Sequence, residues 1–208
     1  MRERNRGFIP PPRIFLPGEE VRTDPGPAEL GALFGRTAPT ELEVGTGRAR
    51  FLLDEAKSHP ERDFLGAEIE VEYARIAQSR ADALGLSNLR VLCLDGKAFV
   101  LARLAPASLE AIHVYFPDPW PKKRHWKRRV IDPEFARAAA LALRPGAPLK
   151  VASDHTGYFT RIFEVLGAEP LLTLETGSQG GWTTGTSYEA KFLAEGRPIE
   201  KGIWLRRT

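Results

Sequence analysis

The chain has 208 residues, of which 42% are hydrophobic, and its 30 basic and 27 acidic side chains give a net charge of +3. This length can bury the core of one domain, and the mild net charge excludes a chain that is strongly basic or acidic throughout. No apolar run approaches the roughly 18 residues of a membrane span, the charged N-terminus is unlike a signal peptide, and the lone Cys93 excludes an intrachain disulfide. We expect a single-domain cytoplasmic protein.

Residues 1–36 combine arginines with clusters of proline and glycine. This composition favours extended or irregular backbone, so we predict a basic N-terminal arm that is flexible in the free protein. Two roles stay open for it: a disordered tail, or an arm that orders on nucleic acid. The domain itself is predicted to span residues 37–208.

Residues 40–44 predict a short buried strand, which runs directly into the turn Gly45-Thr46-Gly47 and then into a helical pattern over residues 51–56. Glycines at positions 45 and 47 permit a tight turn and let a ligand approach the backbone closely. A simple turn is the alternative, because a short glycine pattern is weak when taken alone. The surrounding strand and helix favour a nucleotide-binding loop.

Residues 64–69 predict a second strand, and Glu68 near its end lies 23 positions after Gly45. Nucleotide-binding folds place a carboxylate on ribose hydroxyls at about this spacing. Apolar periodicity then predicts a helix over residues 71–84, with Gly85 as its C-cap. Glu68 is therefore the candidate for a ribose contact.

Acidic residues recur where predicted strands end. Parallel strands end at the same edge of a sheet, so these carboxylates would gather where open α/β folds bind ligands. A dinucleotide-binding sheet would use the first two acids, whereas the third and fourth favour a smaller adenosine ligand. The four residues are Glu43, Glu68, Asp95 after a third strand over 88–94, and Asp118 after a fourth strand over 111–115.

The densest block of positive charge follows the fourth strand. Three prolines within residues 117–121 end that strand and hold Asp118 beside it. Six of the eight residues 122–129 are Lys or Arg, and Trp120 and Trp126 are interleaved with them. A solvated basic face is the alternative, but the tryptophans favour a surface that meets phosphates and stacks on bases. Lys127, Arg128 and Arg129 are the predicted phosphate contacts.

The remaining pattern predicts a helix, a strand, a second helix and two final strands. Asp132 and Pro133 suit the N-cap and first turn of the first of these helices. Asp154 follows the fifth strand at the same edge as the earlier acids. The segment 177–196 between the last two strands is rich in glycine, threonine and serine. The predicted ranges are 132–143, 149–152, 159–166, 168–176 and 199–206.

With these motifs in order, the chain resembles the bacterial tRNA (guanine-N7-)-methyltransferase family, whose members use S-adenosylmethionine. The most specific match is Phe-Pro-Asp-Pro-Trp-Pro-Lys-Lys-Arg-His followed by Lys-Arg-Arg within residues 116–129. The turn at 43–47, Glu68 and the Thr-x-Tyr-Glu-x-Lys-Phe segment at 186–192 agree in order and spacing. The resemblance covers about residues 40–205. It implies a single-domain α/β Rossmann-like methyltransferase fold with a mostly parallel seven-stranded sheet and helices on both faces.

The resemblance also implies the reaction, which is methyl transfer to N7 of guanine 46 in the tRNA variable loop. It leaves the N-terminal arm without a firm match, and Ser153 stands where family members often have threonine. Positions that match cofactor-binding residues are Glu43, Gly45, Gly47, Glu68, Asp95 and Asp118. Positions that match tRNA-binding residues are Lys122, Asp154, Thr186, Ser187, Tyr188 and Glu189.

The chemistry of that reaction needs little acid or base catalysis. Guanine N7 carries a free lone pair, so no proton has to leave before attack, and the enzyme works mainly by orienting the reactants. Asp118 and Asp154 can accept hydrogen bonds from guanine N1 and the exocyclic amine, which makes them the candidate catalytic residues. The expected partners are S-adenosylmethionine and tRNA, without a membrane, an obligate protein partner or a metal, because the histidines and Cys93 lack metal-ligand spacing.

Three alternatives remain. A methyltransferase for another RNA base could use a similar acidic-proline turn. A non-catalytic RNA-binding protein would explain the basic block but leave the strand-end acids without a role. A nicotinamide-dependent dehydrogenase is disfavoured because no part of the sequence resembles a hydride-transfer site.

Overall fold

The computed structural model describes residues 13–16, 19–22, 28–176 and 182–208. The strands are β1 Arg13–Leu16, β2 Glu19–Arg22, β3 Thr40–Val44, β4 Asp63–Glu68, β5 Leu89–Cys93, β6 Ala111–Tyr115, β7 Pro148–Ser153, β8 Leu172–Leu174 and β9 Glu200–Arg206. The α-helices are α1 Leu30–Phe34, α2 Arg50–Ser58, α3 Val71–Ala83, α4 Gly96–Arg103, α5 Pro133–Ala142, α6 Thr156–Gly167 and α7 Ser187–Ala194, and the 3-10 helix η1 spans Lys123–Arg128.

One sheet organises the fold, with the strand order β2-β1-β5-β4-β3-β6-β7-β9-β8. The strands β5, β4, β3, β6 and β7 pair in parallel, and β9 runs antiparallel between β7 and β8. The strands β3 to β9 confirm the predicted seven-stranded, mostly parallel sheet. The chain order reverses between β3 and β6, a switch point at which sheets of this kind bind ligands.

Two further strands extend the sheet beyond β5. The strand β1 pairs antiparallel with β5 through Ile14 and Leu92, and β2 pairs antiparallel with β1. Both strands and α1 fall within residues 1–36, the predicted arm, for which no regular structure was expected. The parts of that prediction at residues 1–12, 17–18 and 23–27 lie outside the described residues.

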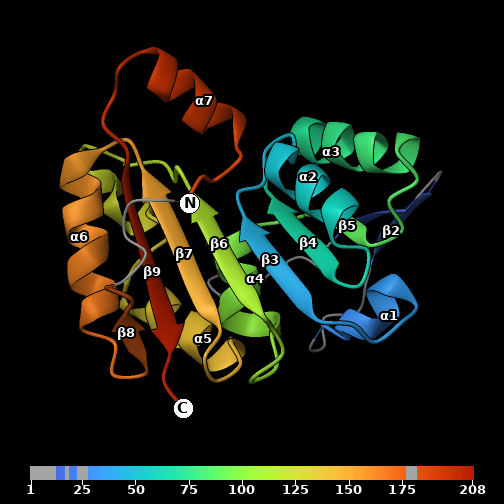
Figure 1. Ribbon diagram of the computed structural model, residues 1–208, viewed down its shortest axis with the longest axis horizontal. Helices are drawn as coiled ribbons and strands as arrows, with labels where there is room; N and C mark the ends of the chain where they lie inside the picture. The colour runs from blue at the N-terminus through green and yellow to red at the C-terminus, as the bar shows by residue number, and fades with distance from the viewer. Residues whose placement is uncertain (1–12, 17–18, 23–27, 177–181) are drawn as a thin grey trace, which may run out of the picture.

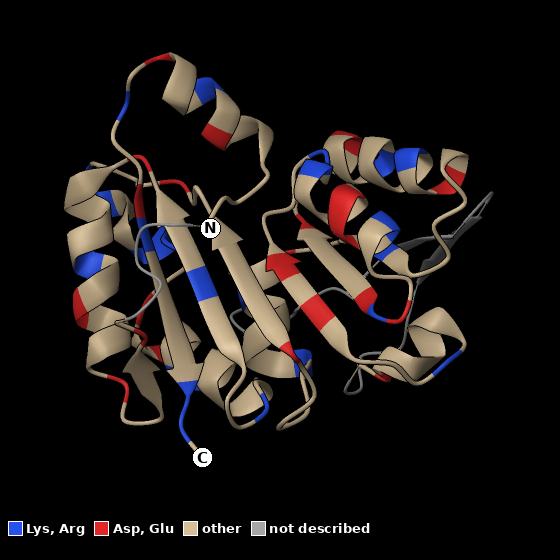
Figure 2. Cartoon of the chain, in the orientation of Figure 1, with Lys and Arg blue, Asp and Glu red and all other residues tan. Residues whose placement is uncertain are grey.

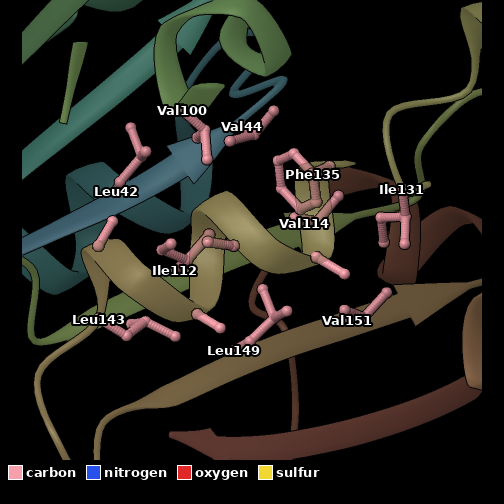
Figure 3. Packing of buried hydrophobic residues seen from close by; sticks show 14 of the residues in the cluster. Leu42, Val44, Val100, Ile112, Val114, Ile131, Phe135, Leu143, Leu149 and Val151 are labelled. Carbon is pink, nitrogen blue, oxygen red and sulfur yellow. The ribbon is translucent and has the colours of Figure 1, made fainter. Parts of the chain in front are cut away.

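Helices cover both faces of the sheet (Figure 1). Apolar residues of α4, α5 and α6 pack on one face, and those of α2 and α3 pack on the other. In Figure 3, Val114 of β6 lies beside Phe135 of α5. Every residue of β3 and β4 is buried, as expected for parallel strands covered on both sides. Because helices cover both faces of these strands, the loops that follow the strands lie at the edge of the sheet.

Local signals explain most helix boundaries. The Asp132 side chain accepts a hydrogen bond from Phe135 N at 2.9 Å, which confirms it as the N-cap of α5. Gly85 adopts a left-handed φ of 67° just after α3, as a helix-ending glycine does. None of the helices in the described ranges has the length and apolar content that crossing a membrane requires.

The helix α7 lies beyond the ends at which β6 and β7 finish, over the ligand edge of the sheet (Figure 1). The glycine-rich composition of residues 177–196 did not predict a helix there. A local signal was present, because Thr186 and Glu189 form the Thr-x-x-Glu pattern of a capping box. The Thr186 hydroxyl accepts a hydrogen bond from Glu189 N at 3.1 Å and begins the helix.

Candidate active site

A cavity of about 240 Å³ opens at the carboxyl edge of the sheet. Its wall comes from the end of β3 and the loop after it, the starts of α2, α3 and α7, and the end of β6. Figure 2 shows acidic residues on both β3 and β4, the strands that border this loop. The sequence-predicted residues in the wall are Glu43, Gly45, Gly47, Thr186, Ser187 and Tyr188.

The glycine loop has the geometry that its sequence predicts. Gly45 and Gly47 adopt left-handed φ angles of 79° and 55°, which side chains other than glycine rarely tolerate. A Cβ atom at either position would meet no other atom within 4 Å. The constraint at both positions is therefore the backbone conformation, and the loop leaves room for a ligand to approach its backbone.

Glu68 holds this loop against the end of β4. Its Oε2 accepts a hydrogen bond from Gly47 N at 2.7 Å, and its Oε1 accepts one from Glu70 N at 2.8 Å. The carboxylate is 7% exposed and does not belong to the cavity wall. Each carboxylate oxygen has a second lone pair, so both could still accept a ligand hydroxyl.

Glu43 is a buried acid in the cavity wall. It is 3% exposed and accepts a hydrogen bond from the Thr46 hydroxyl. Burial raises the pKa of Glu43 to about 8, and the neighbouring charge of Glu68 adds to the rise. The group therefore holds its proton near neutral pH. A ligand cation beside it would favour the ionised form and lower that pKa.

The other strand-end acids lie outside the cavity wall. Asp95 is exposed and caps α4, where its Oδ1 accepts hydrogen bonds from Lys97 N at 2.9 Å and Ala98 N at 3.2 Å. Asp118 is also exposed and makes no hydrogen bond or ion pair with any residue in the described ranges. Both remain near the sheet edge because each follows the end of a parallel strand within three residues.

Asp154 forms an ion pair with Arg197, which the sequence pattern did not single out. The Arg197 guanidinium also lies 4.1 Å over the ring of Phe192 in α7. Phe192 in turn meets Phe116 edge-on, with their ring centroids 5.3 Å apart. This chain of contacts connects Asp154, α7 and the segment that carries Asp118.

The segment after β6 has a constrained backbone. Phe116 and Trp120 adopt left-handed φ angles of 52° and 41°, which are unusual outside glycine. Arg129 closes the segment by donating from Nε to the carbonyl of Pro119 at 2.8 Å. Its guanidinium is held between the rings of Trp126 and Tyr158, at 4.7 and 4.6 Å from the ring centroids. Arg129 thus has a structural role that the sequence pattern did not reveal.

The rest of the basic block faces outward. Arg128 stacks over the Trp120 ring at 4.9 Å, while the side chain of Trp126 is 47% exposed. Lys122 and Lys127 are exposed and make no ion pair within the part of the chain that the structure describes. These groups leave positive charge and an aromatic surface open beside Asp118.

Glu189 lies in the first turn of α7 and holds the loop before that helix. Only 3% exposed, it accepts hydrogen bonds from Thr183 Oγ1 and Thr184 N, both at 2.6 Å, and forms an ion pair with Lys201. Burial alone would raise the pKa of Glu189, but Lys201 and the threonine donors lower it to about 2. Its carboxylate therefore holds the loop that leads to Thr186, and with it the start of α7, which carries the exposed Tyr188.

The cavity wall also contains residues that the sequence pattern did not identify, notably Arg48, Tyr73 and Tyr115. The alternation of side chains along β6 was the available signal, because it places Tyr115 and His113 on one face.

Within the described ranges, no group of three or more His, Cys, Asp or Glu side chains could hold a metal ion.

Comparison with known proteins identifies the family to which these features belong. Residues 37–201 match the model of the protein family described as "Putative methyltransferase". A tRNA (guanine-N(7)-)-methyltransferase of Cutibacterium acnes is 38% identical over 202 residues, which cover 93% of this chain and 73% of that protein. The protein of the same name from Nitrosomonas europaea is 33% identical over 195 residues, covering 92% of this chain and 87% of that one.

Solved structures agree in fold. The 16S rRNA methyltransferase KamB has a TM-score of 0.64 at 17% identity, with 95% of this chain and 100% of that chain covered. The antibiotic-resistance methyltransferase Kmr also has a TM-score of 0.64, at 18% identity, with 94% and 99% covered. At these identities the likeness shows the fold alone.

The strand order, the glycine loop and the cavity at the carboxyl edge of the sheet define a Rossmann-like methyltransferase. More particularly, the chain belongs to the bacterial tRNA (guanine-N7-)-methyltransferase family. This membership confirms the resemblance that the motif at residues 116–129 indicated.

Proposed function

We propose that this protein transfers the methyl group of S-adenosylmethionine to N7 of guanine 46 in the variable loop of tRNA. The observation that carries the proposal is the acid-containing cavity beside the glycine loop, in a chain of this family. The names of the relatives supply the substrate class, and the exposed basic block beside Asp118 suits an RNA backbone. Work on tRNA would place the protein in the cytoplasm.

The residues around the cavity fit this cofactor. S-Adenosylmethionine supplies an electrophilic methyl group on a sulfonium, together with an α-ammonium and ribose hydroxyls. Glu43 suits the α-ammonium, because a buried carboxyl with a raised pKa gains most from a cation. Glu68 would accept from the ribose hydroxyls while keeping its hydrogen bond to Gly47, and Asp95 would contact the adenosine from the start of α4. The backbone of the glycine loop at Gly45 and Gly47 would lie against the polar end of the cofactor.

Asp118 and Asp154 are the proposed catalytic residues. Guanine N7 needs no base, so their task is to accept hydrogen bonds from N1 and the exocyclic amine and to steady the positive charge that methylation creates. Asp118 has no hydrogen-bond or ion-pair partner among the described residues, so its carboxylate is available to a bound guanine. Asp154 is paired with Arg197, so a bound guanine has to share or displace that guanidinium.

The proposed RNA surface extends from η1 to α7. Lys122, Lys127 and Arg128 would contact phosphates, and the exposed ring of Trp126 would offer a stacking surface. Arg129 and Glu189 would support this surface from inside, because both are engaged by the fold. Thr186, Ser187 and the exposed Tyr188 would meet the RNA where α7 borders the cavity.

The test uses purified full-length protein, labelled S-adenosylmethionine and unmodified tRNA transcripts, followed by identification of the methylated nucleoside. The expected product is 7-methylguanosine, lost when guanine 46 is replaced by adenine. A different methylated nucleoside would refute the guanine assignment, and 7-methylguanosine that survives the replacement would refute position 46. Absence of any methylation, with S-adenosylmethionine bound, would refute tRNA as the substrate.

A further inference from the structure

Three buried side chains beside the cavity form a hydrogen-bonded line that the proposed reaction does not use. His113 Nε2 lies 2.9 Å from Oε2 of Glu41, and His113 Nδ1 lies 2.8 Å from the Tyr115 hydroxyl. Arg62 donates to the other Glu41 oxygen at 2.7 Å. The exposed fractions of Glu41, His113 and Tyr115 are 8%, 1% and 7%. The line therefore runs from Arg62 to the cavity wall, where Tyr115 lies.

The charges of the neighbours set the direction of each hydrogen bond. Burial would raise the pKa of Glu41, but His113 and Arg62 lower it to about 2, so this carboxylate is ionised and can only accept. His113 Nε2 must then carry the proton. Burial lowers the pKa of His113 and keeps the ring neutral, which leaves Nδ1 as an acceptor. The Tyr115 hydroxyl is consequently the donor to His113.

This direction makes Tyr115 electron-rich. A phenol that donates its proton to an imidazole, itself held by a carboxylate, carries more negative charge on its oxygen and ring than a phenol that accepts. The ring is also fixed in place, because Phe51 meets it edge-on at 5.2 Å and Trp182 lies 5.8 Å away. Aromatic rings attract cations, and the attraction grows with the electron density of the ring.

We propose that Tyr115 is a specificity-determining residue that favours S-adenosylmethionine over the reaction product, S-adenosylhomocysteine. This proposal rests on the proposed function. Glu41 and His113 are positioning residues that act through Tyr115. The two ligands share the adenosine and the α-ammonium, so Glu43 and Glu68 bind both alike. They differ in the sulfonium cation, which the product lacks, and an electron-rich ring in the cavity wall responds to that difference. Preference for the cation would limit product inhibition.

The test measures dissociation constants for both ligands by calorimetry, without tRNA, on wild type, Tyr115→Phe and Glu41→Gln. Tyr115→Phe removes the polarised hydroxyl and keeps the ring. Glu41→Gln leaves the cavity wall intact but removes the charge that fixes the histidine proton, and it carries the test if Tyr115→Phe does not fold. We expect each variant to bind S-adenosylmethionine about threefold more weakly, with S-adenosylhomocysteine unchanged. The NMR resonance of the Tyr115 Cζ atom should also shift in Glu41→Gln, because Glu41 acts on the Tyr115 hydroxyl through His113.

Trp204→Phe is the matched control, because Trp204 is also buried but packs against Phe159 and Phe163 on the other face of the sheet. It should lower stability and leave the ratio of the two dissociation constants unchanged. Equal weakening of both ligands in Tyr115→Phe and Glu41→Gln, or no weakening, would overturn the inference and spare the proposed function. Wild-type protein that binds neither ligand would instead refute the proposed cofactor, and this inference with it.

Discussion

The amide of Gly47 donates a hydrogen bond to the carboxylate of Glu68 at 2.7 Å, which joins the glycine loop after β3 to the end of β4. The two residues are 21 positions apart, and parallel pairing of β3 with β4 brings them together. One carboxylate thus shapes the loop and is also available to a ribose. Loss of Glu68 should therefore affect the cofactor through two contacts.

We expect Glu68→Ala to weaken S-adenosylmethionine binding by about 1.5 to 3 kcal/mol, since a charged acceptor for hydroxyl groups is lost and the loop is released. Calorimetric titration of purified protein gives the dissociation constant directly. Glu70→Ala is the control, because Glu70 contributes only its backbone amide to Glu68. An unchanged dissociation constant for Glu68→Ala would move the ribose site elsewhere.

Cofactor affinity should rise with pH as the solution approaches pH 8. Glu43 has a pKa of about 8 in this structure, against an ordinary value of 4.5, so it holds a proton that a cationic ligand would displace. Calorimetry in buffers of different ionisation enthalpy should detect the released proton, and Glu43→Gln should abolish the release. Binding without proton release in wild type would show that the ligand cation lies away from Glu43.

The same pKa implies a cost to folding. Between pH 4.5 and about 8 the folded state binds a proton that the unfolded state has lost, so the free energy of unfolding should fall as pH rises through this window. Glu43→Gln should remove that part of the pH dependence. Chemical denaturation at several pH values measures both proteins, and parallel curves would contradict the expectation.

Glu189 should stabilise the protein through its ionised form. Its pKa is lowered to about 2, so its contribution is complete above the ordinary pKa of 4.5 and is lost as pH falls toward 2. Glu189→Gln leaves Lys201 without its ion-pair partner and should cost about 3 kcal/mol. Glu164→Gln is the control, because its ion pair with Arg161 is exposed and should contribute less than about 1 kcal/mol. Similar losses in urea denaturation would contradict this difference.

The basic block should separate into RNA contacts and structural contacts. Lys122→Ala with Lys127→Ala should weaken tRNA binding and reduce the slope of log affinity against log salt by about 0.7 to 0.9 per lost phosphate contact. Arg129→Ala should instead lower the melting temperature, because Arg129 holds Pro119 and lies between two aromatic rings. An unchanged salt slope in the lysine double variant would make these lysines a solvated surface.

Asp118→Asn should reduce turnover at least about 100-fold, or about 2.7 kcal/mol, because an amide donor would face the donors of guanine. The melting temperature should hardly change, since Asp118 is exposed and has no partner among the described residues. Asp154→Asn should affect RNA affinity more strongly and also loosen Arg197. Single-turnover methylation and thermal denaturation measure these effects, and near wild-type rates in both variants would place the site elsewhere.

The sequence by itself determined the repeating strand and helix pattern, the glycine loop and the edge at which the strand-end acids gather. These features depend on neighbours a few positions apart, because side-chain periodicity, capping residues and left-handed glycines act locally. The alternation of strands with helices along the chain also suffices to predict a parallel sheet. The helix α7 escaped because a glycine-rich composition outweighed its capping pattern, Thr186 to Glu189.

Only the tertiary structure decided which polar group meets which partner. Arg129 turns inward to Pro119 while the neighbouring lysines face solvent, although all belong to one basic run. Glu189 pairs with Lys201, and Asp154 pairs with Arg197, across loops whose paths no local pattern specifies. Such contacts form between residues far apart in sequence, and burial then sets their charge. The charge of a residue therefore does not reveal its partner, and packing decides which contact it makes.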